Sequence, residues 1–367
     1  MTILVLFGGV SPEHEVSLRS AAYVLECLAA HGTYELLPVG ITKDGRWLHY
    51  PGDDWDAIAG DAWENHPGCR SAVLSPARGD GLLVDGDKRR VDVVFPALHG
   101  CNGEDGSVQG LCQLAGIPCV GADSTGSAVC MDKGVMRSLV ERQGIRLAAW
   151  DSFFYDAFKA DPDAVTARLA PLGYPLFIKP ARAGSSVGIS KVHAPGDLSA
   201  ALARAAAIDG KIIAESAVKG REFEVAVIGN RDLVLSPVGE IILTGAEFYD
   251  YEAKYIDDTV ARTACPADIP DDVSETIRGM AAQVYQAVGC EGLARVDFFL
   301  DEQGPVFNEI NTLPGDTSIS LFPKLMELAG YSGPALMARL VDLAVEGHAL
   351  HVERDIRGLP HQVKGHG

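Results

Sequence analysis

The amino-acid sequence predicts an α/β protein with more than one domain. Its 367 residues exceed the length that a single hydrophobic core usually serves. Short apolar strands alternate with amphipathic helices from the first residues onward, which is typical of an open α/β sheet. Farther along, two alternating strands flank a polar turn at 301–304, which predicts an antiparallel hairpin. The sequence therefore indicates an N-terminal open parallel sheet followed by α+β units with antiparallel sheets.

The first unit is expected at residues 1–122. Residues 3–7 predict a buried strand and not a signal peptide, because the apolar stretch is short and lacks a basic start. An amphipathic helix is predicted from about Ser17 to Ala30, ending at Gly32. Further strands are predicted at 36–41, 91–97 and 117–120, a helix at 106–115, and a surface insertion at 51–87.

The second unit is expected at 123–219 and the third at 220–350, followed by a tail at 351–367. The second should contain a helix at 133–143, strands at 177–179, 187–191 and 211–215, and an alanine-rich helix before the last strand. The third should contain strands at 223–228, 241–243, 294–300 and 306–310, and helices at 271–288, 324–328 and 334–346. The tail has little apolar periodicity, so we expect its end to be frayed.

Composition narrows the class of function. The chain is 47% hydrophobic and contains no apolar run long enough to span a bilayer. Its net charge of −19 disfavours nucleic acid or an anionic membrane as the main partner. The eight cysteines have no CxxC or Cys/His spacing, which indicates reduced thiols and not metal ligands. We therefore expect a cytoplasmic protein that acts on small molecules, with self-association as a homodimer left open.

Two strands of the third unit carry a polar face. Alternation with period two places Arg295 and Asp297 on one face, and Glu309 and Asn311 on one face of the next strand. Two carboxylates and an amide are oxygen donors that suit Mg²⁺, which proteins commonly share with a nucleotide's phosphates. The set predicts phosphoryl chemistry. The alternative, an ordinary hairpin with one face in water, is disfavoured because the polar face carries complementary ligand types.

A loop of small residues at 180–188 joins two strands of the second unit. Such a loop lets backbone amides approach an anion closely, and Lys179 at the strand end would reach the same phosphates. The loop is not a Walker A sequence, because GxxxxGK[ST] is absent. Glu215 and Glu222 could accept hydrogen bonds from adenine and ribose, although their spacing fits solvated acids equally well.

Two polar loops follow strands of the first unit, at the sheet edge where open α/β sheets bind ligands. The loop at 8–17 contains Glu13, which could hold an ammonium group. The loop at 99–106 contains His99, which either contacts a substrate or satisfies hydrogen bonds within the loop. A dinucleotide site is disfavoured because GxGxxG is absent.

Together these motifs resemble the D-alanine–D-alanine ligase family of the ATP-grasp superfamily. The agreement extends over all three units, through 8–17, 98–106, 131–133, 179–188, 247–255 and 295–320. The resemblance implies an N-terminal substrate-binding domain and two ATP-grasp domains that hold ATP between them. It also implies two Mg²⁺ ions, for which Mn²⁺ can substitute. The implied reaction joins two D-alanines through an acyl phosphate, for peptidoglycan synthesis.

The resemblance further implies a role for individual residues. The metal ligands would be Asp297, Glu309 and Asn311. ATP would be bound by Lys133, Lys179, Ser186, Glu215, Glu222 and Lys254, under a closing loop at 248–255. The catalytic residues would be Glu13, Ser185 and Tyr255 at the first ammonium group, and Arg295 and Gly315 at the oxyanion. The substrates would be met by His99, Ser320 and Leu321.

Asp316 departs from this resemblance, because family members usually carry a large apolar residue directly after the oxyanion glycine. A carboxylate beside the acceptor's own carboxylate would be unfavourable, so we expect Asp316 to point to solvent. Because of Asp316, the alternative remains a ligase of the same superfamily that uses D-serine or another D-amino acid as its acceptor. A non-catalytic nucleotide-binding protein is disfavoured, because it would not need both metal ligands and an oxyanion donor.

Overall fold

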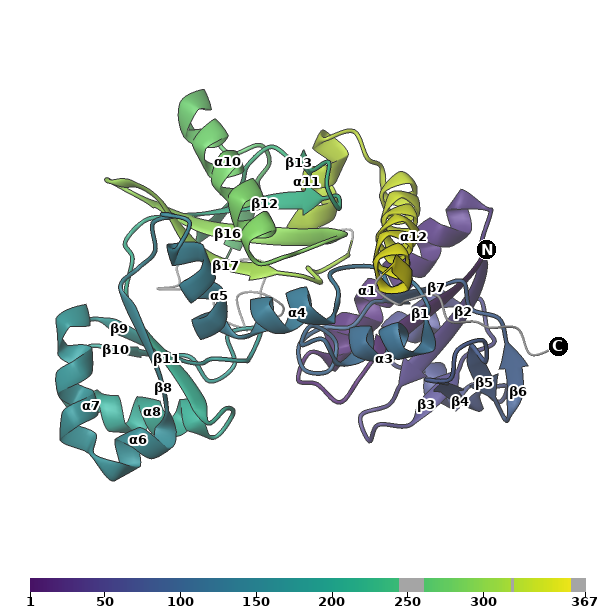
Figure 1. Cartoon of the computed structure of the whole chain (residues 1–367), viewed down its shortest axis with the longest axis horizontal. Coiled ribbons are helices and arrows are strands. Elements are labelled where there is room, and N and C mark those ends of the chain that lie inside the picture. Colours follow the sequence, from purple (N-terminus) through teal and green to yellow (C-terminus); the bar gives the residue numbers. More distant parts are fainter. Residues whose placement is uncertain (244–260, 318–319, 358–367) are drawn as a thin grey trace.

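The computed structural model describes residues 1–243, 261–317 and 320–357. These residues form three β-sheets, of seven, four and six strands, with helices packed against them (Figure 1). The sheets follow one another along the chain in the predicted order, and the two later sheets are antiparallel. The predicted fold class is therefore confirmed, whereas the limits at 122, 219 and 350 stay predictions.

The first sheet is parallel only at one end. Its strands are β1 (Thr2–Gly8), β2 (Glu35–Ile41), β3 (Trp47–His49), β4 (Arg70–Leu74), β5 (Leu82–Val84), β6 (Asp87–Arg89) and β7 (Val93–Pro96). β1 lies between β2 and β7 and is parallel to both, while the strands beyond β2 are antiparallel. The predicted strand at 117–120 forms a single bridge, from Val94 to Cys119.

The predicted surface insertion at 51–87 is wrong in part, because this segment contributes β4, β5 and the start of β6 to the sheet. These strands are too short to display a clear period of two. The helices of this part are α1 (His14–His31), α2 (Trp55–Ala59), α3 (Ser107–Ala115) and α4 (Ser124–Met131). α1 ends at Gly32 as predicted, in a left-handed conformation with φ 76°.

The second sheet has the order β10-β9-β11-β8. Its strands are β8 (Trp150–Phe154), β9 (Leu176–Pro180), β10 (Ser190–Val192) and β11 (Lys211–Ser216). The helices are α5 (Lys133–Glu141), α6 (Tyr155–Ala160), α7 (Pro162–Leu169) and α8 (Leu198–Ala206). The sequence predicts α5, α8 and three of the four strands. β8 and the two short helices after it were not predicted.

The third sheet has the order β15-β14-β12-β16-β17, with β13 paired to β12. Its strands are β12 (Arg221–Ile228), β13 (Val234–Leu235), β14 (Gly239–Leu243), β15 (Ala261–Ala264), β16 (Leu293–Asp301) and β17 (Gly304–Asn311). The helices are α10 (Asp271–Ala287), α11 (Leu321–Leu328) and α12 (Gly333–Arg357). The predicted hairpin is confirmed: Asp297 lies opposite Glu309, and Arg295 lies opposite Asn311.

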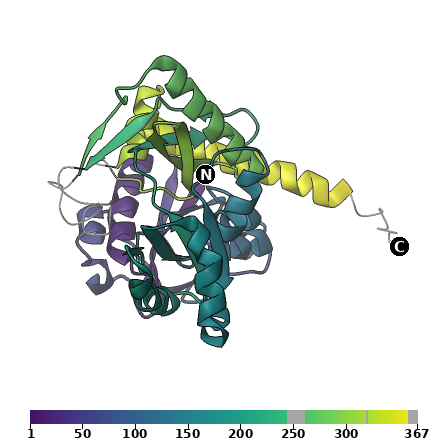
Figure 2. The same ribbon diagram turned by 90° about the vertical axis from the view of Figure 1, so that its left-hand side faces the viewer.

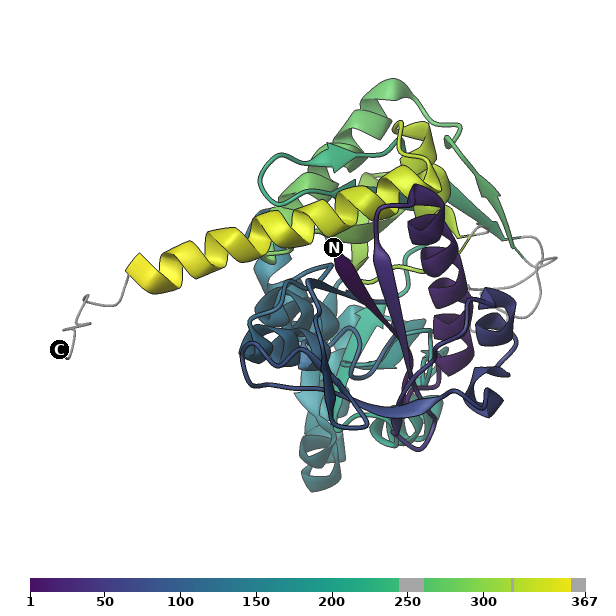
Figure 3. The same ribbon diagram turned by 90° about the vertical axis from the view of Figure 1, so that its right-hand side faces the viewer.

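The long helix α12 returns from the third sheet to the first. It packs against α1 and β7, and Leu336, Leu340 and Val341 share one buried core with residues of both. α12 continues through the predicted limit at 350 to Arg357, and Figures 2 and 3 show its end projecting from the rest of the chain. The start of the tail, 351–357, is therefore helical, whereas its end at 358–367, where fraying is predicted, lies outside the described residues. None of the helices in the described ranges is long and apolar enough to cross a membrane.

Candidate active site

A cavity of about 1780 Å³ lies where the three sheets meet, and residues of all three units line it. It brings together nearly all of the described residues that the sequence predicts for the site: Glu13, His99, Lys133, Lys179, Ser185, Ser186, Glu215, Glu222, Arg295, Glu309, Asn311, Gly315, Ser320 and Leu321. Asp297 belongs to the same cluster but is buried beneath the lining. Lys254, Tyr255 and the predicted closing loop lie outside the described residues.

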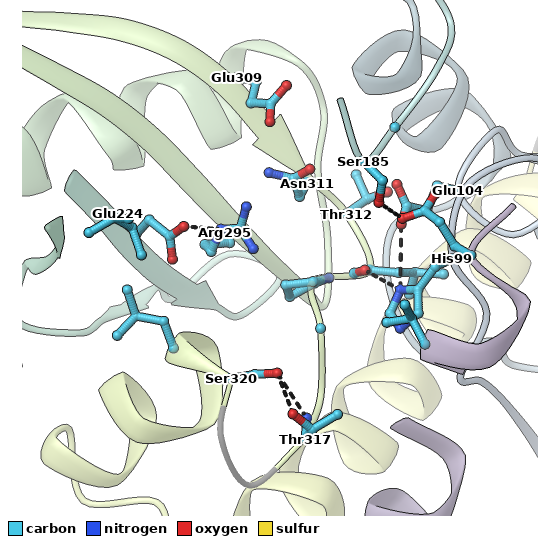
Figure 4. A pocket seen from close by; sticks show the side chains of 18 of the residues that line it. His99, Glu104, Ser185, Glu224, Arg295, Glu309, Asn311, Thr312, Thr317 and Ser320 are labelled. Atoms are coloured by element: carbon cyan, nitrogen blue, oxygen red, sulfur yellow. Dashed lines mark hydrogen bonds and ion pairs between the residues drawn. The ribbon is translucent and has the colours of Figure 1, made fainter. Parts of the chain in front are cut away.

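An acidic row crosses three strands of the third sheet. Glu224 on β12 lies opposite Asp297 on β16, which lies opposite Glu309 on β17. Arg295 donates to both carboxylate oxygens of Asp297 at 2.8 Å, and its Nε lies 3.2 Å from Glu224 Oε1. Asn311 Nδ2 also donates to Asp297, at 3.0 Å. Figure 4 shows Glu224, Arg295, Asn311 and Glu309 along one side of the cavity.

Electrostatics keep this row charged although it is buried. Burial by itself lowers the pKa of Arg295, but Asp297 and Glu224 outweigh it and hold that pKa above its usual value. The guanidinium therefore stays protonated and compensates two carboxylates that are nearly inaccessible to solvent. Glu224 is absent from the predicted set. The sequence feature that could have identified Glu224 is its position on an alternating strand, two residues after Glu222 and so on the same face.

The donor set fits the predicted Mg²⁺ ions. Asp297, Glu309 and Asn311 are neighbours on the hairpin and offer only hard oxygen ligands, as Mg²⁺ prefers. In the part of the chain that the structure describes, no three His, Cys, Asp or Glu side chains gather as a metal site. The predicted set therefore depends on the amide oxygen of Asn311 as its third donor. Lys133 Nζ lies 3.7 Å from Glu309 Oε2, so a cation already faces the accessible carboxylate.

Basic side chains surround Glu215 at the end of β11. Lys179 Nζ donates to Glu215 Oε2 at 2.8 Å, and Arg137 Nη2 lies 2.9 Å from Glu215 Oε1. Burial raises the pKa of Glu215, but Arg137, Lys179 and Lys133 together outweigh it, so the pKa is lowered. Glu215 is thus a buried, ionised carboxylate and not a solvated one. The sequence analysis missed Arg137, whose signal is its position one helical turn after Lys133.

The glycine loop of the second unit meets the first unit at Glu13. Ser185 and Ser186 adopt positive φ values of 48° and 58°, and Ser185 Oγ donates a hydrogen bond to Glu13 Oε1. A side chain at Gly100, whose φ is 69°, would collide with the other oxygen of Glu13. The predicted pairing of Glu13 with Ser185 is therefore present, and it joins segments that are far apart in the sequence.

His99 lines the cavity and is hydrogen-bonded to residues outside its own loop, and its contact with a substrate stays a prediction. Its Nε2 lies 2.8 Å from Ser20 Oγ, and its Nδ1 lies 3.2 Å from the Leu313 carbonyl oxygen. Burial lowers the pKa of His99, but Glu104, Glu13 and Asp316 outweigh it and raise the pKa. Figure 4 shows His99, Glu104 and Ser185 across the cavity from Arg295. This end of the cavity is therefore acidic.

The segment before α11 forms the remaining wall. Gly315, Ser320 and Leu321 line the cavity there, as predicted. Ser320 Oγ accepts a hydrogen bond from the Thr317 amide at 3.2 Å and lies 2.7 Å from Thr317 Oγ1. These bonds hold Ser320 beside Gly315, where a side chain on the glycine would approach the Ser320 hydroxyl to 3.2 Å.

The expected outward orientation of Asp316 is wrong. The residue is only 7% exposed, and its Oδ1 has no hydrogen-bond partner among the described residues. Gly315 and Thr317 line the cavity, whereas Asp316 is buried and does not, and its charge contributes to the raised pKa values of Tyr23 and Cys27 on α1. The prediction failed because it assumed strand-like alternation in a segment that is irregular. Burial raises the pKa of Asp316 to about 7, although His99 opposes the shift.

Two family models match this chain. The model described as "D-ala D-ala ligase N-terminus" matches residues 2–122, and the one described as "D-ala D-ala ligase C-terminus" matches residues 139–342. Antiparallel sheets that enclose a cavity lined with lysines and carboxylates define the class of ATP-grasp proteins. The chain belongs to the D-ala D-ala ligase family within that class.

Relatives cover nearly the whole chain. The D-alanine–D-alanine ligase of Deinococcus radiodurans is 47% identical over 94% of this chain and 98% of its own. That of Acetivibrio thermocellus is 45% identical, over 94% and 96%. Among solved structures, the D-alanine–D-alanine ligase of Coxiella burnetii is 32% identical, with a TM-score of 0.85 over 97% of each chain. The VanG D-Ala:D-Ser ligase of Enterococcus faecalis is 40% identical, with a TM-score of 0.84 over 94% and 99%.

The buried Asp316 carboxyl should make stability depend on pH. Its pKa is about 7 in the folded chain, against an ordinary value of 3.8, so folding favours the protonated form. Stability should fall as pH rises from about 4 to 7, by at most about 4 kcal/mol. Asp316→Asn does not titrate at this position. The free energy of unfolding of the variant minus that of the wild type should therefore be larger at pH 8 than at pH 4.5, as measured by denaturant unfolding. The same pH dependence in both proteins would contradict the assignment.

Proposed function

We propose that this chain is an ATP-dependent ligase that joins two D-alanines into D-alanyl-D-alanine, in the cytoplasm, for peptidoglycan precursors. One observation carries the proposal. A single cavity combines an acidic end at Glu13, a basic end at Lys133 and Lys179, and the Arg295 row, whose Glu309 lies 3.7 Å from Lys133. The acidic end suits an amino acid's ammonium group, and the basic end suits a nucleotide's phosphates.

The residues at the acidic end would bind and orient the first D-alanine. Glu13 accepts the ammonium group, and its hydrogen bond from Ser185 fixes the direction of its carboxylate. His99 lines the same part of the cavity and is held by hydrogen bonds with Ser20 and the Leu313 carbonyl oxygen. The substrate carboxylate then points away from the acids, toward the phosphates. Orientation of this kind removes much of the entropic barrier to the reaction.

In the first step, a carboxylate oxygen of the first D-alanine attacks the γ-phosphorus of ATP, and the bond from phosphorus to the bridging oxygen of ADP breaks. Lys133 and Lys179 offset the charge on the phosphates. Mg²⁺ bound by Asp297, Glu309 and Asn311 would supply further neutralisation of the phosphate oxygens. The product is an acyl phosphate, whose phosphate is a good leaving group.

In the second step, the amine of the second D-alanine attacks the acyl carbon and phosphate leaves. Negative charge develops on the carbonyl oxygen, and the Arg295 guanidinium with the Gly315 amide would stabilise it. Ser320 and Leu321 line the cavity beside Gly315 and would meet the second amino acid. The ammonium group of the second D-alanine loses one proton to water before the attack, and the nitrogen loses a second proton to the departing phosphate or to water as the amide forms.

A D-serine acceptor is the second candidate. A structural relative of this chain at 40% identity is a D-Ala:D-Ser ligase. Phosphate release from ATP, measured with D-amino acids singly and in pairs, separates the two candidates. We expect D-alanine alone to give the highest turnover and D-alanyl-D-alanine as product. Faster turnover for D-alanine with D-serine would support the second candidate, and no release with any D-amino acid would contradict both.

Glu309→Gln should abolish ligation and leave the fold intact. Glu309 is the accessible carboxylate of the donor set, and an amide in its place lacks the charge that holds a divalent cation. Dipeptide formation should fall at least 100-fold, while the melting temperature without ligand stays within a few degrees of the wild type. Ligation at a near wild-type rate would contradict this metal set.

Arg295→Lys should separate the two steps. Lysine retains a cation beside Asp297 and Glu224 but loses the planar fork that a developing oxyanion would contact. The acyl phosphate should still form and be trapped by hydroxylamine as a hydroxamate. Dipeptide synthesis should slow on the order of 100-fold, equivalent to about 3 kcal/mol. Loss of the hydroxamate would place Arg295 in the first step instead.

A further inference from the structure

Arg137 is a fully buried cation that none of the steps above uses. It lies on α5, and its Nη2 is 2.9 Å from Glu215 Oε1 on β11 and donates to the Asn308 carbonyl oxygen on β17 at 3.0 Å. It therefore touches both antiparallel sheets that flank the nucleotide end of the cavity. Its Nε and Nη1 have no hydrogen-bond partner among the described residues. A buried guanidinium with spare donors is costly, so its charge needs an explanation.

Two cations share one carboxylate at this point, and they differ in how firmly they are held. The Arg137 side chain is 2% exposed and is anchored by a backbone carbonyl as well as by Glu215. The Lys179 side chain is 13% exposed, lines the cavity, and has a long flexible stem. Lys179 is thus free to change partners, whereas Arg137 is not.

The carboxylate itself has acceptor capacity to spare. Glu215 Oε1 makes the ion pair with Arg137 but has no aligned hydrogen-bond donor among the described residues. Oε1 is itself buried, but Glu215 lines the cavity, and its other oxygen, Oε2, can accept a hydrogen bond from a donor on a ligand once Lys179 leaves it. An exocyclic amino group on a purine is such a donor.

We propose that Arg137 is the permanent counter-ion of Glu215, which releases Lys179 to the phosphates of ATP while Glu215 remains an anionic acceptor for the adenine amino group. This inference rests on the proposed function, because it needs ATP in this cavity. Without Arg137, departure of Lys179 would leave a buried carboxylate short of positive charge. Arg137 is accordingly a positioning residue that acts through Glu215.

A pH dependence follows from the charges that face Glu215. These are Arg137 and Lys133 from α5 and Lys179 from β9, and Lys133 also faces Glu309 on β17. They lower the pKa of Glu215 against the effect of burial. Removing Arg137 should raise that pKa, above all when Lys179 has moved to ATP. Affinity for ATP should then weaken as pH falls in the variant, but not in the wild type.

The test compares two nucleotides by calorimetry: ATP, and purine riboside triphosphate, which lacks the 6-amino group. Arg137→Met should weaken binding of both nucleotides, because Glu215 then retains Lys179, and should weaken ATP about tenfold or more beyond the analogue, in line with the further loss of a hydrogen bond to a charged group. Arg137→Lys should retain the preference for ATP. Lys179→Met should weaken both nucleotides equally, because it removes a phosphate contact. Arg142→Met, an exposed change at the end of the same helix, is the matched control.

The ratio of variant to wild-type affinity for ATP is measured from pH 5.5 to 8, so that titration of the nucleotide cancels. We expect this ratio to fall toward low pH. Equal weakening of both nucleotides, or a ratio independent of pH, would overturn the inference and assign Arg137 a merely structural role. If Arg137→Met does not fold, Arg137→Met combined with Glu215→Gln should fold, since no buried carboxylate then lacks a partner; failure of this rescue also overturns it. Absence of ATP binding by the wild type would instead overturn the proposed function.

Discussion

The structure depends on the way one guanidinium compensates neighbouring buried carboxylates. Glu224 and Asp297 lie side by side on adjacent strands, almost out of contact with solvent. Such a pair would be destabilising without a cation between the strands. Arg295 supplies that cation, with two hydrogen bonds to Asp297 and a close contact to Glu224. Because Asp297 is engaged in this way, Glu309 remains the carboxylate that faces the cavity.

The opposite face of the same hairpin explains why this row points into the cavity. Phe298 and Phe307 pack edge to face, 5.9 Å apart, in a core that includes residues of α10 and α5. A β-bulge at 297/298 interrupts the alternation, so Phe307 faces this core while Glu309, two residues later, lies opposite Asp297 and lines the cavity. α12 then carries the chain back to the first sheet, where it shares a core with α1. Core packing on both sides therefore sets the distance across the cavity.

Charge is distributed unevenly along the cavity. The chain as a whole carries a net charge of −19, yet Lys133, Arg137 and Lys179 gather at one end. At the other end, Glu13, Glu104 and Asp316 all raise the pKa of His99. Neither end is neutral by itself, and each is suited to a ligand of opposite charge. A zwitterionic amino acid and a nucleotide satisfy the two ends together, which an overall charge cannot reveal.

The sequence by itself determined the order of the units, most strands and helices, and the residue types of the site, because alternation and loop composition are local properties. It predicted that the strand of Arg295 and Asp297 pairs with the strand of Glu309 and Asn311 as an antiparallel hairpin, since a short turn joins them. It did not predict the β-bulge at 297/298 that brings Glu309 opposite Asp297. Tertiary structure alone decided the rest. Arg137 and Glu224 form ion pairs with residues that are distant in the sequence, and β4 and β5 are recognised by their pairing. Asp316 is buried although its segment is irregular. Burial and ion pairing depend on contacts between distant segments, and a local pattern carries no information about them.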